Sequence, residues 1–93
     1  MKIKKWRRAT IDERAAYDGV YPLSHIIELH DKAYPMLFVE RLPGGSDEPK
    51  YEVIAPDGYH FSEQVHSLLC FSRQDVLDRV AWNDLEPCTE KCG

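Results

Sequence analysis

The stretch from Met36 to Ser62 constrains the fold more than any other part of the sequence. It contains two runs rich in apolar, β-branched and aromatic residues, residues 36–42 and 50–55, and a third short run, residues 59–62. A loop rich in Pro, Gly and Asp joins the first two runs, and a Pro-Asp-Gly turn leads into the third. Such runs, separated by turn residues, predict a small antiparallel β-meander of about three strands.

Helix signals lie on both sides of this sheet. Thr10 and Glu13 have the spacing of a capping box, which predicts a helix over residues 11–18. Ser72 stands in the N-cap position of a second segment, residues 73–82, in which apolar residues recur at helical spacing. Helices beside an antiparallel meander define the predicted fold class, which is α+β.

Two further segments fit both helix and strand. In residues 22–32 the apolar residues recur at i, i+3 and i+4 from Leu23, so we predict a third helix. The alternative is a strand through Ile26 and Ile27, because β-branched residues favour strands. Residues 63–71 form an apolar run too short for its periodicity to decide between the two.

The length and composition indicate one domain. The chain has 93 residues, of which 43% are hydrophobic and 30% charged, as in ordinary globular proteins. We divide it into a basic N-terminal arm or edge strand (1–9), a single α+β domain (10–84) and a polar C-terminal tail (85–93). No apolar run approaches the length of a membrane span, and no signal-peptide pattern follows the basic N-terminus, so we expect a cytoplasmic protein.

Charge is unevenly distributed along the chain. The formal net charge is −4, but the first eight positions hold 5 of the 12 basic residues, so the remaining 7 stand against 16 acidic residues. An acidic body repels phosphate backbones, and no nucleic-acid-binding signature accompanies the basic N-terminus with Trp6, which disfavours nucleic acid as a partner. The basic N-terminus can attract the acidic body of a second copy, which makes a homo-oligomer an open alternative.

The acidic body predicts a protein partner with a basic surface. The predicted protein-binding residues lie in and around the meander: Glu40, Asp47, Glu48, Glu52, Asp57, Tyr59 and Glu63. A short, acidic, single-domain chain is typical of small inhibitors encoded by phages and mobile elements, anti-CRISPR proteins among them, and also of housekeeping adaptors. The hypothesis is that the chain occludes a basic, nucleic-acid-handling protein by steric or charge-mimicking contact.

Metal ligands and catalytic motifs are weakly represented. Zinc-type ligands occur in the last third of the chain, at His60, His66, Cys70, Cys88 and Cys92. Their spacing matches no familiar zinc finger, so no cofactor is predicted, and a zinc-stabilised module is the alternative. Cys88 and Cys92 are also close enough in sequence to form a disulfide.

We predict that the chain is not an enzyme. It contains no nucleophile elbow, no phosphate-binding glycine loop and no HExxH motif. The alternative, a small enzyme of unknown reaction, would require a concave pocket lined by His60, His66 or Cys70.

Overall fold

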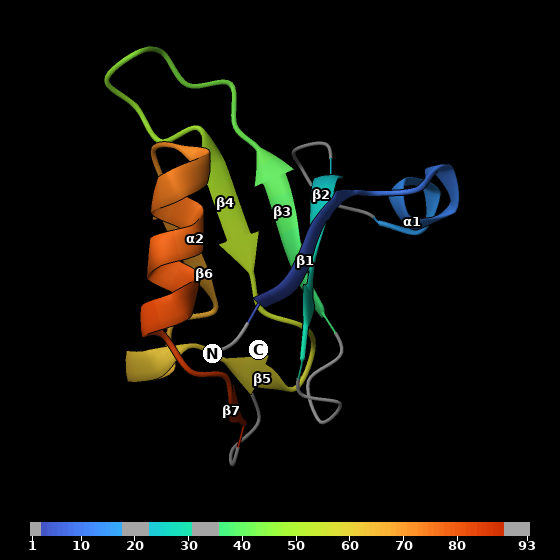
Figure 1. Ribbon diagram of the computed structural model, residues 1–93, viewed down its shortest axis with the longest axis vertical. Coiled ribbons are helices and arrows are strands. Elements are labelled where there is room, and N and C mark those ends of the chain that lie inside the picture. Colours follow the sequence, from blue (N-terminus) through green and yellow to red (C-terminus); the bar gives the residue numbers. More distant parts are fainter. Residues whose placement is uncertain (1–2, 18–22, 31–35, 89–93) are drawn as a thin grey trace.

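The computed structural model describes residues 3–17, 23–30 and 36–88, and its main element is a five-stranded antiparallel sheet (Figure 1). The strands, in their order across the sheet, are β1 (Ile3–Arg8), β2 (Leu23–Leu29), β3 (Met36–Arg41), β4 (Tyr51–Ile54) and β6 (Ser67–Cys70). Two α-helices accompany the sheet, α1 (Ile11–Ala16) and α2 (Arg73–Trp82). The predicted α+β class is confirmed.

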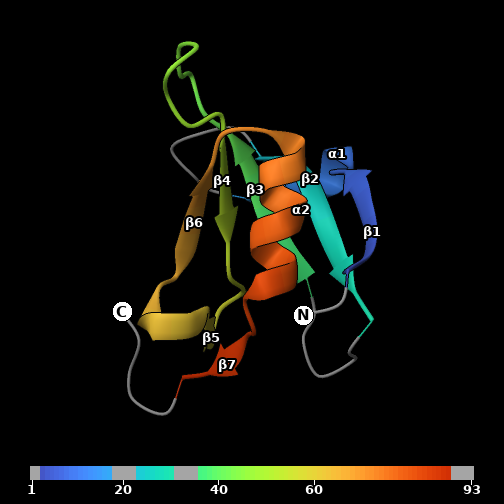
Figure 2. The same cartoon turned by 60° about the vertical axis from the view of Figure 1, so that its left-hand side comes forward.

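Helix α2 lies across one face of the sheet and contacts β6, β1 and β4 (Figure 2). Ser72 accepts a hydrogen bond from the backbone N–H of Asp75, so the helix begins where its N-cap predicts. Val76 and Val80 are fully buried against the sheet. The core between helix and sheet contains Ile27, Leu29, Leu37, Val39, Val53, Phe61, Cys70, Val76, Val80 and Leu85.

Helix α1 is short and lies near the ends of β1 and β2, away from α2 (Figure 1). The predicted capping box is present: Thr10 Oγ1 accepts from the Glu13 N–H, and the Glu13 carboxylate accepts from the Thr10 N–H. Arg7 of β1 donates to the same carboxylate at 2.7 Å and also to Glu28 of β2, which ties the helix to the sheet. The helix ends at Ala16, short of the predicted 11–18, of which residue 18 lies outside the described residues.

The prediction of a helix over residues 22–32 is wrong, because residues 23–29 form β2, the second strand of the sheet. Ile26 and Ile27 are both fully buried, although they point to opposite faces of the sheet. A strand buried on both faces carries apolar residues without alternation. The helical spacing from Leu23 therefore arose from a strand with two apolar faces.

The third predicted strand, residues 59–62, does not join the main sheet. Its first half forms β5 (Tyr59–His60), which pairs with β7 (Glu86–Pro87) in a separate two-stranded sheet. A short 3-10 turn, η1 (Ser62–Gln64), then reverses the chain, with Glu63 and Gln64 at positive φ. Phe61 is fully buried and holds the segment 55–66 against the core. The strand that pairs with β4 is therefore β6 and not residues 59–62.

Two alternatives left open by the sequence are resolved. Residues 67–70, inside the ambiguous segment 63–71, form strand β6. The N-terminal basic residues form β1, which pairs with β2 at the edge of the sheet opposite β6. Among the described residues no helix is long and apolar enough to cross a membrane.

Candidate functional site

Strand β6 forms an outer edge of the sheet and leaves part of its backbone unpaired by any described strand. Ala55 N–H donates to the His66 carbonyl oxygen at 2.9 Å, so hydrogen-bonded pairs with β4 occur at even-numbered positions of this segment. Ser67 and Leu69 occupy the alternate pairs, opposite Ile54 and Glu52. Their N–H and C=O groups therefore point away from β4, toward the open side of the strand.

Exposed apolar side chains accompany this edge. Leu69 is 47% exposed, Phe71 is 49% exposed and Val65 is 39% exposed. Leu69 lies within β6, and Val65 and Phe71 lie just before and just after the strand. An edge strand with free backbone groups and apolar side chains is a template for pairing with another chain.

The predicted acidic binding residues do not form one continuous face. Asp47 and Glu48 are exposed in the loop between β3 and β4, at one end of the sheet (Figure 1). Asp57 and Glu63 are exposed near β5 and η1 at the opposite end, where Tyr59 is half-buried. Strand β6 runs between these two ends of the sheet. It begins just after η1, and the carbonyl oxygen of its last residue, residue 70, accepts a hydrogen bond from the N–H of residue 50 at the end of the loop.

Two predicted acidic residues point to the face of the sheet that α2 does not cover. Glu40 is only 3% exposed and accepts a hydrogen bond from the Tyr17 hydroxyl, so it serves the fold rather than an exposed surface. Burial and the neighbouring Glu40 carboxylate raise the pKa of Tyr17. Glu52 is half-buried and accepts from the Ser67 hydroxyl at 3.2 Å, which places it directly beside the β6 edge.

The zinc-ligand candidates are dispersed among the described residues, in which no group of three or more His, Cys, Asp or Glu could hold a metal ion. The His60 and His66 rings lie 6.3 Å apart, and His60 Nδ1 already contacts the Phe61 carbonyl oxygen at 2.7 Å. Cys70 lies four residues beyond His66 along the strand, about 13 Å away, which is too far to share one ion. Cys88 is disulfide-bonded. Cys92 lies outside the described residues.

Cys70 and Ser67, the nucleophilic side chains of β6, are not activated by the described residues around them. Burial raises the pKa of Cys70 to about 11, so its thiol remains protonated at neutral pH. Ser67 donates to Glu52, and no histidine contacts its hydroxyl. A pocket of about 240 Å³ brings His66 beside Asp57 and Tyr59, but no serine or cysteine lines it.

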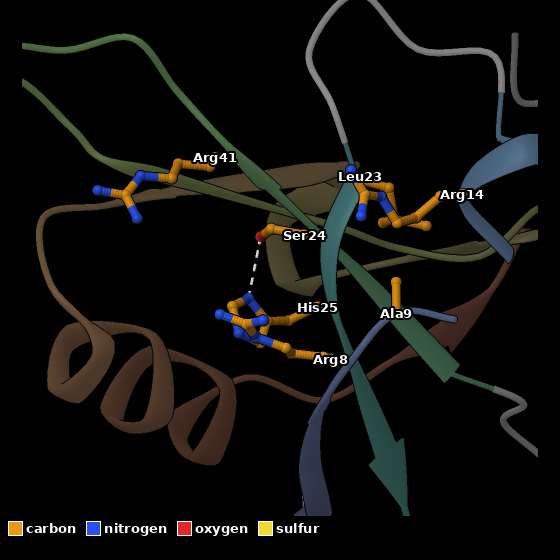
Figure 3. Close-up of a pocket in the computed structure, with 7 residues that line it drawn as sticks. All are labelled: Arg8, Ala9, Arg14, Leu23, Ser24, His25 and Arg41. Carbon is orange, nitrogen blue, oxygen red and sulfur yellow. Dashed lines mark hydrogen bonds between the residues drawn. The ribbon is translucent and has the colours of Figure 1, made fainter. Parts of the chain in front are cut away.

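A second pocket, of about 300 Å³, opens at the end of the sheet from which the β3–β4 loop projects (Figure 3). Its lining comes from four elements or their flanking residues: Arg8 and Ala9 after β1, Arg14 of α1, Leu23, Ser24 and His25 of β2, and Arg41 of β3. No carboxylate is among these described lining residues. We call this pocket the arginine pocket; its lining is basic, although the predicted body is acidic overall.

His25 lies at the centre of this positive charge. Its Nδ1 is 3.0 Å from the Ser24 hydroxyl oxygen, and that hydroxyl donates to the Val39 carbonyl at 3.2 Å. Nδ1 therefore carries the proton in the neutral ring and donates to Ser24. Burial lowers the pKa of His25, and the charges of Arg8, Arg73 and Arg41 lower it further.

Sequence reasoning did not single out the arginine pocket, because its residues are far apart in the chain. The only available signal was the excess of basic residues near the N-terminus, and that signal gave no indication that Arg14 and Arg41 would join Arg8. No protein-family model matches the chain, and no curated protein or solved structure matches it.

Proposed function

We propose that this chain is a non-enzymatic protein-binding module whose partner adds an extended, positively charged segment to the open edge of β6. The observation that carries the proposal is the outward-facing backbone of Ser67 and Leu69 beside exposed apolar side chains. In this recognition mode the backbone hydrogen bonds supply affinity, and side-chain pockets beside the edge supply specificity.

Charge around the edge favours a basic partner. Glu52 lies opposite Leu69 in the β4–β6 register, and Glu63 is exposed in the turn before β6. Asp47 and Glu48 are exposed in the loop whose end is hydrogen-bonded to the last residue of the strand. Carboxylates at both ends and beside the middle of the edge would attract lysines or arginines of an incoming segment and raise the association rate.

The wider role that we propose is inhibition by occlusion. A small acidic module that covers a basic surface would exclude whatever anionic polymer that surface normally binds. The partner class that fits is a protein that handles nucleic acid, and a source in a phage or other mobile element would agree with this role.

A matched pair of charge reversals tests the proposal, once the partner has been captured from the native host and identified by mass spectrometry. Glu48→Lys combined with Glu63→Lys, at the two ends of the β6 edge, should slow association with the partner about tenfold at low salt. Asp12→Lys combined with Asp78→Lys, on α1 and α2, makes the same change in net charge and should have little effect. Surface plasmon resonance measures both rates. Equal slowing by the two pairs would show that only net charge matters and would remove the role of this edge.

A further inference from the structure

The arginines of this chain fall into two groups according to their partners. Arg7 is paired with Glu13 and Glu28, and Arg79 is paired with Asp75. The other arginines are Arg8, Arg14, Arg41 and Arg73. None of these four makes an ion pair with a described residue, and Arg73 instead lies over the Trp6 ring at 5.4 Å. All four lie at or beside the arginine pocket, since the first three line it and Arg73 acts electrostatically on His25.

We propose that the arginine pocket binds the phosphate group of a small molecule. Arg8, Arg14 and Arg41 lie at separate places around the pocket (Figure 3), and no carboxylate among the described residues lines it. Like charges that line one pocket repel one another. With no carboxylate among the described lining residues, solution ions or a bound anion would supply the charge balance. A concave site with charges of one sign concentrates ligands of the opposite sign.

The geometry favours a phosphate over a single carboxylate. One guanidinium satisfies a carboxylate with two parallel hydrogen bonds, whereas here Arg8, Arg14 and Arg41 come from β1, α1 and β3 (Figure 3). A phosphate has oxygens that point in several directions and can accept from donors on different elements.

The size and surroundings favour a small ligand over a nucleic-acid strand. The volume of about 300 Å³ is at the lower end of the range for small-molecule sites. A polymer would need positive charge extended along a groove. Here Asp75 lies in the first turn of α2, the helix that carries Arg73. The exposed Asp47 and Glu48 lie in the β3–β4 loop at the same end of the sheet.

Binding of the anion should be coupled to protonation of His25. The groups that face this ring are Ser24 on its own strand, Trp6 and Arg8 from β1, Arg41 from β3 and Arg73 from α2. An anion among the arginines offsets their repulsion and so favours the charged imidazolium. The complex would then take up a proton, and affinity would rise as the pH falls.

Isothermal titration calorimetry on the full chain at low ionic strength tests the proposal with inorganic phosphate and a nucleoside monophosphate as probes. We expect saturable binding with a Kd of about 1 mM or tighter. Arg8→Gln and Arg41→Gln should each weaken it about tenfold, because each removes charge-assisted hydrogen bonds. Arg79→Gln removes the same charge outside the pocket and should leave the Kd unchanged. The variants alter exposed side chains, and a thermal melt checks that each one is folded.

The pH dependence of binding is measured with sulfate, because sulfate does not change its own charge near neutral pH. Sulfate binding should tighten between about pH 7.5 and 5.5 in the wild type. His25→Asn keeps a donor near Ser24 but cannot take up a proton, so it should bind with little dependence on pH. A pH dependence that persists in His25→Asn would overturn the coupling.

Three results would overturn the phosphate site itself. The first is an absence of saturable binding by either phosphate probe up to about 10 mM. The second is equal weakening by Arg41→Gln and Arg79→Gln, which would indicate attraction by net charge alone. The third is a single-stranded oligonucleotide that binds far more tightly than both small probes with a steep salt dependence, which would identify a polymer surface instead.

Discussion

Phe61→Ala should lower the free energy of unfolding by about 3–5 kcal/mol. Phe61 is fully buried although it lies outside the main sheet, between β5 and η1. Its ring fills the core under α2, and its N–H donates to the Val65 carbonyl oxygen at 2.7 Å. Truncation of Phe61 leaves a large cavity where its ring holds the segment 55–66 against the core. For a domain with a total stability of about 5–15 kcal/mol, such a loss approaches unfolding.

Urea denaturation followed by circular dichroism measures this effect, with Phe71→Ala as the matched control. Phe71 is 49% exposed, so its truncation should cost less than about 1 kcal/mol. Similar losses in the two variants would show that Phe61 is not a core residue, and the placement of β5, η1 and β6 would then be wrong.

Leu69→Pro should weaken partner binding at least about tenfold while the protein stays folded. The Leu69 N–H points away from β4, so proline at this position removes a donor that only an added strand would use. Proline is tolerated in edge strands where the N–H faces solvent, and the expected loss of stability is less than about 1 kcal/mol. The binding loss is measured with the captured partner by surface plasmon resonance.

Leu68→Pro is the control for this substitution, one residue away. Leu68 is paired with Val53 in the hydrogen-bonded register, so proline there breaks the ladder between β4 and β6. This variant should lose at least about 1–3 kcal/mol of stability. If Leu69→Pro binds the partner as the wild type does, strand addition at β6 is excluded.

Local signals predicted several elements well. The Ser72 cap and the helical spacing after it gave the bounds of α2, residues 73–82, as the structure has them. The paired strands around the Pro43–Pro49 loop were also predicted within a residue or two, because turn residues bound each apolar and β-branched run. In these segments the information lies within a few neighbouring residues.

Long-range pairing explains what the sequence did not predict. Strand β2 lies between β1 and β3 and buries side chains on both faces, so its pattern lacks the period of a one-sided strand. Residues 67–70 pair with β4, and residues 59–62 do not, because Phe61 enters the core and the chain reverses at Glu63. Neither outcome can be read from residues close in sequence.

The spatial arrangement of the candidate site residues could not be read from the sequence for the same reason. A count of acidic residues treats them as one surface, but the structure buries Glu40 and separates Asp47 from Asp57 at opposite ends of the sheet. The arginine pocket depends on the antiparallel pairing of β1 with β2 and of β2 with β3, which brings Arg8 and Arg41 to the same end. Charge counts do not reveal this arrangement.

Hydrogen–deuterium exchange, read residue by residue by NMR, is the most direct test of the claim that β6 is an open edge to which a partner strand can pair. In the isolated protein the amides of Ser67 and Leu69 should exchange much faster than those of Leu68 and Cys70, which face β4. On addition of the captured partner, the amides of Ser67 and Leu69 should become protected. Slow exchange of these two amides in the isolated protein, or fast exchange that persists in the complex, would contradict the account.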